Sequence, residues 1–148
     1  CVAPDVGGTE RARALGKILN VGLAIVDKRR PKQGQSQVMN IVGEVKGKTC
    51  IIVDDIIDSG GTIVNAAKAL KDRGAKEVFV YITHGVLSGE AVNKIKNSVI
   101  KNLVITDTID NMNRVKGVKN IEVLSISGLM AEAIKRISNS TSVSDLFK

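Results

Sequence analysis

The 148-residue sequence has few aromatic residues and few cysteines, and it contains no long apolar run. Tryptophan is absent, and the aromatic residues are Phe79, Tyr81 and Phe147. They leave few rings on which nucleic-acid bases could stack. No apolar run approaches the roughly 18 residues that a membrane-spanning helix needs. We therefore expect neither a nucleic-acid-binding protein nor a membrane protein.

The two cysteines, Cys1 and Cys50, allow a single disulfide. Cys50 lies in an apolar segment that predicts a buried strand, so we expect reduced thiols and a cytoplasmic protein. With so few aromatic residues, the core must consist of Val, Ile, Leu and Ala. A hydrophobic content of 43% over this length is enough for one domain spanning residues 1–148.

The sequence has a formal net charge of +7, and its cations are densest in the first quarter. Because base-stacking rings are scarce, a small polyphosphate ligand explains this cluster at least as well as RNA does. The cluster comprises Arg11, Arg13, Lys17, Lys28, Arg29, Arg30 and Lys32.

Apolar periodicity predicts alternating strands and helices. Strands are expected at residues 21–26, 38–44, 49–54, 78–83, 103–106 and 121–124, and helices at residues 9–19, 63–73, 89–97 and 129–137. This order predicts an α/β fold, a doubly wound and mainly parallel sheet with helices on both faces. Ligands bind such sheets beyond the carboxyl ends of the strands, where Asp5, Asp27–Arg30, Asp54 and His84 are expected.

The segment Val53–Thr62 has the pattern of a phosphate-binding turn between a strand and a helix. Gly60 and Gly61 allow the backbone to approach a ligand closely, and the first N–H groups of the helix, with the hydroxyls of Ser59 and Thr62, can bind phosphate oxygens. The acidic pair before them, Asp54 and Asp55, suits ribose hydroxyls or hydrated magnesium instead. No lysine lies in the turn, so it is not a Walker loop. The alternative is that Asp55 and Asp58 merely cap the helix.

A second charged segment, Lys28-Arg29-Arg30, directly follows a predicted strand. Three consecutive cations repel one another unless an anion is near, although solvated surface charge is the simpler alternative. The polar stretch that follows, to Gln37, could close over a ligand and reopen for product release. Without a bound anion, we expect this loop to be disordered.

The sequence resembles the ribose-phosphate pyrophosphokinase family, whose fold is that of the type I phosphoribosyltransferases. The resemblance covers nearly the whole chain. It rests on the segments at residues 3–8, 11–13, 25–31, 38–43, 53–62, 83–84, 87–89, 131–134 and 142–147. One departure is Gly85, where the family usually has proline, and we assign no role to the neighbouring His84.

The resemblance implies transfer of the diphosphoryl group of Mg-ATP to ribose 5-phosphate, giving phosphoribosyl pyrophosphate and AMP. It implies that Lys28 and Arg30 are catalytic, that Arg30 also contacts substrate, and that Asp5 holds Mg²⁺. The implied ribose 5-phosphate ligands are Asp54, Asp55, Asp58, Ser59, Gly60, Gly61 and Thr62.

The resemblance also implies a preceding domain that supplies the ATP base pocket. We therefore expect this C-terminal half to bind ribose 5-phosphate but to be inactive alone. The resemblance further implies a homo-oligomer, which is a hexamer in the intact enzyme. It makes Ser142 and Ser144 candidate ligands of a regulatory site. The alternative is that these serines belong to a disordered serine-rich tail. Two other functions remain open, namely a phosphoribosyltransferase and a non-catalytic regulatory relative.

Overall fold

The computed structural model describes residues 1–29 and 38–147, with backbone alone at residues 28, 29 and 38. The strands are β1 (Val2–Ala3), β2 (Ala24–Arg29), β3 (Val38–Val42), β4 (Thr49–Ile57), β5 (Glu77–Gly85), β6 (Asn102–Thr106) and β7 (Ile121–Leu124). The helices are α1 (Thr9–Leu19), α2 (Gly61–Asp72), α3 (Ala91–Lys96), α4 (Met112–Val115), α5 (Ser127–Ser138) and the 3₁₀ helix η1 (Ser144–Phe147). No helix in these described ranges is long and apolar enough to cross a membrane.

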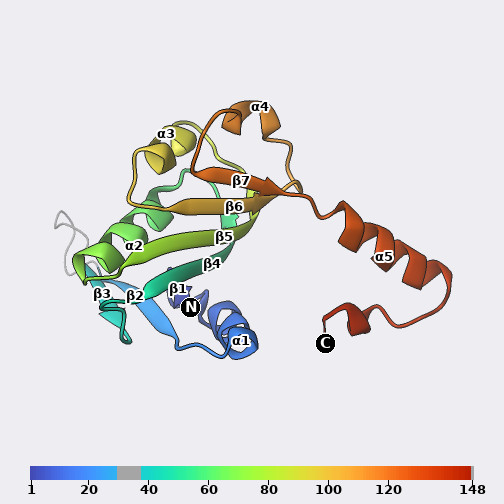
Figure 1. The fold of residues 1–148 in the computed structure, drawn as a ribbon, viewed down its shortest axis with the longest axis horizontal. Helices are drawn as coiled ribbons and strands as arrows, with labels where there is room; N and C mark the ends of the chain where they lie inside the picture. The colour runs from blue at the N-terminus through green and yellow to red at the C-terminus, as the bar shows by residue number, and fades with distance from the viewer. Residues whose placement is uncertain (30–37, 148) are drawn as a thin grey trace.

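The strands form one sheet in the order β3-β2-β1-β4-β5-β6-β7 (Figure 1). Every neighbouring pair is parallel except β2 and β3. The predicted α/β fold with a mainly parallel sheet is therefore confirmed. Because all strands from β4 to β7 point the same way, their carboxyl ends lie along one edge.

The core lies between the sheet and the helices α2 and α3. Alternate residues of a strand point to opposite faces, and Ile52 of β4 and Val80 of β5 both have no exposed surface. Leu70 of α2 and Ile95 of α3 are equally buried. Aliphatic side chains thus build this core, as the scarcity of aromatic residues predicts.

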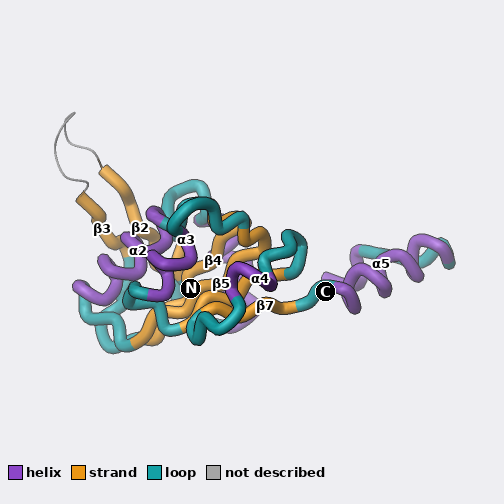
Figure 2. The backbone as a smooth tube through the Cα atoms, turned by 90° about the horizontal axis from the view of Figure 1, so that it is seen from above, coloured by secondary structure: helices purple, strands orange, loops and turns teal. Residues whose placement is uncertain are grey.

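The opposite face of the sheet is only partly covered. Helix α1 packs against β1 and β4, while Tyr81 of β5 and Leu124 of β7 remain 43% and 56% exposed. Helix α5, expected at residues 129–137, forms there but projects away from the sheet (Figures 1 and 2). Its apolar residues Ile134 and Ile137 are exposed. Within the described residues, apolar side chains are therefore open on the sheet and on α5.

Several strand boundaries differ from the prediction, and those of β2 and β4 differ most. The strand expected at residues 21–26 begins at Ala24, because Asn20 adopts a left-handed conformation (φ 52°) that ends α1, and the Val21 N–H donates to the Gly16 carbonyl. The central strand does not end at Asp54 but continues to Ile57. The short helix α4 was not predicted.

Candidate functional site

The loop between β1 and α1 brings Asp5 to the carboxyl edge of the sheet. Its Oδ1 accepts a hydrogen bond from the Gly8 N–H at 3.0 Å, which fixes the carboxylate across the loop. Only one of its two oxygens is used in this contact. The other oxygen is available as a ligand, in keeping with the predicted metal-binding role.

Strand β4 carries the acidic pair Asp54 and Asp55, and both bind Arg11 of α1. The Arg11 Nη1 lies 2.7 Å from Asp54 Oδ1, and the Arg11 Nη2 lies 2.8 Å from Asp55 Oδ2. The Asp55 N–H also donates to Asp54 Oδ1 at 3.0 Å. We interpreted Arg11 above as part of a cluster for a polyphosphate, but here it pairs with two carboxylates of the chain. One guanidinium thus joins helix α1 to both acids of the central strand.

The pKa of Asp54 is raised above its ordinary value, chiefly because the carboxyl is partly buried. The nearby carboxylates of Asp55 and Asp5 act in the same direction. The Asp55 N–H and the Arg11 guanidinium oppose them. Burial of the Asp54 carboxyl thus outweighs the attraction of the Arg11 guanidinium.

The turn at residues 58–60 joins β4 to helix α2. Gly60 adopts a left-handed conformation (φ 75°), which favours glycine, and forms the N-cap of α2. No side chain caps this helix, and its first turn contains no acidic residue. The alternative reading, that Asp55 and Asp58 cap the helix, is therefore wrong. The Gly60 and Gly61 N–H groups make no hydrogen bond within the described ranges, so they are available to an anion.

Neighbouring segments hold the turn by its carbonyl groups. The Val86 and Leu87 N–H groups donate to the Ile57 carbonyl at 2.9 and 3.1 Å, and the Ser88 N–H donates to the Asp58 carbonyl at 3.1 Å. Lys94 Nζ donates to the Ser59 carbonyl at 3.2 Å. These contacts use the carbonyl groups of the turn and fix its backbone, and they engage none of its N–H groups.

The basic segment begins within β2. Ala3 of β1 pairs with Ile25, and β2 continues past it through Lys28, whose backbone pairs with Met39 of β3. Lys28 therefore lies beyond the carboxyl end of β1, the strand that leads to Asp5. Arg30 and the loop expected to be disordered lie outside the described residues.

Three further residues singled out in the sequence, His84, Ser142 and Ser144, have local partners. His84 of β5 contacts the Thr108 hydroxyl through Nδ1 at 2.9 Å. Ser142 and Ser144 share a hydrogen bond between their hydroxyls at 2.8 Å, next to η1. These serines follow α5 and do not join the edge that carries Asp54.

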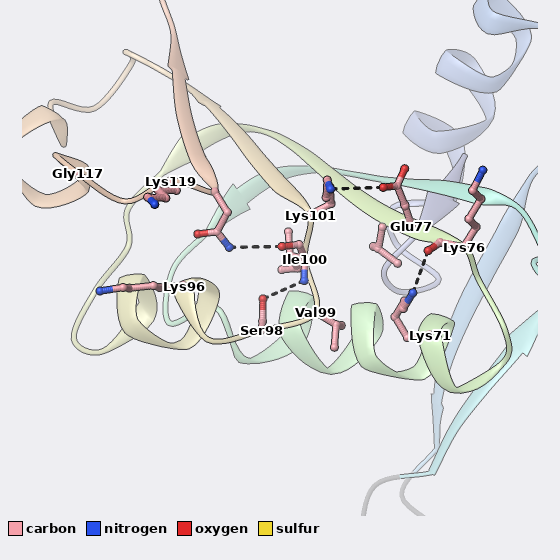
Figure 3. A pocket seen from close by; sticks show the side chains of 12 residues that line it. Lys71, Lys76, Glu77, Lys96, Ser98, Val99, Ile100, Lys101, Gly117 and Lys119 are labelled. Carbon is pink, nitrogen blue, oxygen red and sulfur yellow. Dashed lines mark hydrogen bonds and ion pairs between the residues drawn. The ribbon is translucent and has the colours of Figure 1, made fainter.

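A lysine-lined groove of about 730 Å³ lies at the opposite, amino edge of the sheet (Figure 3). Lys71 and Lys96 belong to the last turns of α2 and α3, where backbone carbonyls concentrate negative partial charge. Lys71 donates to the Lys76 carbonyl at 2.9 Å, and Lys101 pairs with Glu77 at 3.6 Å. Helix ends thus account for Lys71 and Lys96, and Glu77 for Lys101. The groove is not part of the candidate site.

The residues that the structure describes offer few protein ligands for a metal ion. Within residues 1–29 and 38–147, no three or more His, Cys, Asp or Glu residues are grouped so as to hold a metal ion. Magnesium does not need such a group, because it keeps several waters and binds one or two carboxylates together with substrate phosphates. The half-buried Asp5 fits that requirement.

Comparison with known proteins gives close relatives over the whole chain. The ribose-phosphate pyrophosphokinase of Chromobacterium violaceum is 56% identical over 146 residues, which are 99% of this chain and 45% of that protein. The ribose-phosphate pyrophosphokinase of Hyphomonas neptunium is 58% identical over 147 residues, 99% of this chain and 47% of that protein. The chain thus spans about half the length of the curated relatives it matches.

Solved structures and a family model agree with these relatives. Phosphoribosylpyrophosphate synthetase from Mycobacterium smegmatis superposes with a TM-score of 0.84 at 37% identity, over 94% of this chain and 44% of that one. A purine phosphoribosyltransferase from Pyrococcus horikoshii, with a TM-score of 0.51 at 22% identity over 84% of this chain and 73% of that one, shares the fold alone. The family model described as "Phosphoribosyl synthetase-associated domain" matches residues 24–148. The chain therefore belongs to the ribose-phosphate pyrophosphokinase family and carries its phosphoribosyl synthetase-associated domain.

Proposed function

We propose that this chain, as one domain, carries the ribose 5-phosphate site of a ribose-phosphate diphosphokinase. The observation that supports the proposal most is the uncapped start of α2, which the short turn at residues 58–60 joins to a strand with two adjacent carboxylates. A phosphorylated sugar offers both complementary groups, an anion and neighbouring hydroxyls. A site for inorganic phosphate would use the start of α2 but would give Asp54 and Asp55 no part in ligand binding.

In this proposal, the turn binds the 5-phosphate and the acidic pair binds the ribose hydroxyls. The phosphate accepts hydrogen bonds from the N–H groups of Gly60 and Gly61 and from the Ser59 and Thr62 side chains. Asp58 lies at the start of the turn, and the Ser88 N–H fixes its backbone. Positioning of this kind supplies much of the rate of a transfer between two bound substrates.

The chemical step is attack of the ribose 1-hydroxyl oxygen on the β-phosphorus of ATP, with AMP as leaving group. Lys28 and Arg30 would stabilise the negative charge that develops on the transferred diphosphoryl group, and Arg30 would bind two of its oxygens. Asp5 would hold Mg²⁺, which offsets charge on the ATP phosphates. The position of Lys28 beyond the end of β1, the strand leading to Asp5, supports this division of roles.

We further propose that the chain acts within a larger assembly. The open apolar face at Tyr81 and Leu124, and the exposed stripe of α5, are surfaces that further protein would cover. The remaining half of the relatives' length would supply the ATP base pocket, and a homo-oligomer, a cytoplasmic hexamer, would bring Ser142 and Ser144 to a regulatory site. Light scattering of the intact protein tests the hexamer, and a monomer at micromolar concentration would contradict it.

Phosphorus NMR with Mg-ATP and ribose 5-phosphate tests the proposed activity. We expect no turnover by this chain alone, and formation of phosphoribosyl pyrophosphate with AMP once the chain is extended to the relatives' full length. AMP is the informative product, because transfer of the γ-phosphoryl group would release ADP instead. An extended, folded protein that binds both substrates and forms no AMP would contradict the proposal. It would leave a non-catalytic relative as the better reading.

A further inference from the structure

Arg11 makes a contact with the acidic pair that the predicted site does not include. It lies in the first half of α1, 43 residues before Asp54 and 44 before Asp55, and it places one Nη atom on each carboxylate. Each contact uses one oxygen, Asp54 Oδ1 and Asp55 Oδ2. The second oxygen of each carboxylate accepts none of the hydrogen bonds that the structure describes. Two acceptors thus remain on two adjacent residues.

Strand geometry alone does not bring these two carboxylates together. Asp54 and Asp55 are consecutive residues of β4, and consecutive side chains in a strand point to opposite faces. Two adjacent carboxylates also repel each other. Arg11 overcomes both effects, because its planar guanidinium can bind two acceptors at fixed spacing. Both carboxylates converge on this one guanidinium.

We propose that Arg11 is the positioning residue of the sugar site. It holds Asp54 and Asp55 side by side, so that their second oxygens accept hydrogen bonds from two neighbouring hydroxyls of the pentose. Its positive charge also offsets the acidic pair, which would otherwise repel the phosphate of the same ligand. This inference rests on the proposed function and goes beyond it by naming what orients the acidic pair.

The simpler reading is that the ion pair only fastens α1 to the sheet. Such a role should affect stability little, because the Arg11 side chain is 39% exposed and surface ion pairs contribute about 0–1 kcal/mol. It would also affect all sugar phosphates equally. The two readings therefore differ in ligand specificity.

Calorimetric titration of ribose 5-phosphate into this chain tests the inference, with 2-deoxyribose 5-phosphate as a probe that lacks one hydroxyl. We expect Arg11→Ala to weaken ribose 5-phosphate binding about tenfold, which corresponds to the loss of one charged hydrogen bond. The same change should weaken binding of 2-deoxyribose 5-phosphate less. Arg11→Lys should recover only part of the affinity, because an ammonium group cannot bind both carboxylates in the same geometry. Arg73→Ala, an exposed arginine at the C-cap of α2 and thus at the end of that helix remote from the turn, is the matched control and should bind normally.

A double-mutant cycle completes the test. Asp55→Asn combined with Arg11→Ala should lose less affinity than the sum of the single changes, because both remove the same interaction. Equal affinity of a folded Arg11→Ala variant and the unaltered chain would overturn the inference alone. Equal losses of affinity for ribose 5-phosphate and 2-deoxyribose 5-phosphate would also overturn it. So would additive effects of Arg11→Ala and Asp55→Asn on affinity. Failure of the unaltered, folded chain to bind ribose 5-phosphate would overturn the proposed site itself, and the role of Arg11 with it.

Discussion

Replacement of Lys28 by alanine is expected to lower turnover about 10²–10³-fold in a protein of the relatives' full length, the usual loss when one group that stabilises developing charge is removed. Binding of ribose 5-phosphate should change by less than about twofold, because Lys28 belongs to β2 and not to the turn at residues 58–60. Initial-rate kinetics of AMP release, with calorimetry for the sugar, measure the two effects separately.

The matched control for this variant is Lys96→Ala. Lys96 is exposed in the groove at the amino edge of the sheet, so its removal changes the net charge equally but should leave the rate unchanged. Full activity of Lys28→Ala would contradict the catalytic role. A rate loss explained entirely by weaker sugar binding would move Lys28 into the ribose 5-phosphate site.

Gly43→Ala is expected to lower the free energy of unfolding by about 3–4 kcal/mol. Gly43 has φ +113°, and an added Cβ would lie 2.7 Å from the Leu23 carbonyl oxygen and 2.9 Å from the Ala24 Cα. Both are backbone atoms at the start of β2, so the clash cannot be relieved by rotating a side chain. Urea unfolding followed by circular dichroism measures the change.

Gly47→Ala separates backbone conformation from steric contact. Gly47 also has positive φ, +72°, but an added Cβ there meets nothing within 4 Å. Its loss should be only the conformational penalty of about 1–2 kcal/mol. Equal losses at both positions would mean that the close approach of Gly43 to β2 does not determine the packing of this strand pair.

The sequence was sufficient for the fold because the fold depends on local periodicity. Helix α1 has the predicted bounds Thr9–Leu19, and β7 has the predicted bounds Ile121–Leu124. The error at β2 has a local cause. Val21 has the character of a strand residue, but the left-handed conformation of Asn20 places it in the termination of α1.

The candidate site was predictable in its residue types but not in its contacts. The Asp-Asp pair and the Gly-Gly turn are visible in the sequence, whereas the pairing of Arg11 with Asp54 and Asp55 joins segments that only the fold brings together. One signal was available: three acidic residues expected at one edge require a nearby cation. Periodicity also could not show that α5 projects away from the sheet. An amphipathic stripe indicates that one face of a helix is to be covered, but it does not show which surface covers that face.

The central claim is that the turn preceding α2 binds the phosphate of ribose 5-phosphate. Calorimetric titration of this chain with ribose 5-phosphate and, separately, with ribose tests it most directly. The variant to compare is Gly61→Val, since an added Cβ at Gly61 meets nothing within 4 Å in the free protein but obstructs the close approach of a phosphate. Gly128→Val, near the start of α5 and equally open, is the matched control.

We predict saturable binding of ribose 5-phosphate, with no binding of ribose at the same concentrations. Gly61→Val should lose this binding, and Gly128→Val should retain it. Unchanged affinity in a folded Gly61→Val variant, or no binding by the unaltered chain, would contradict the claim.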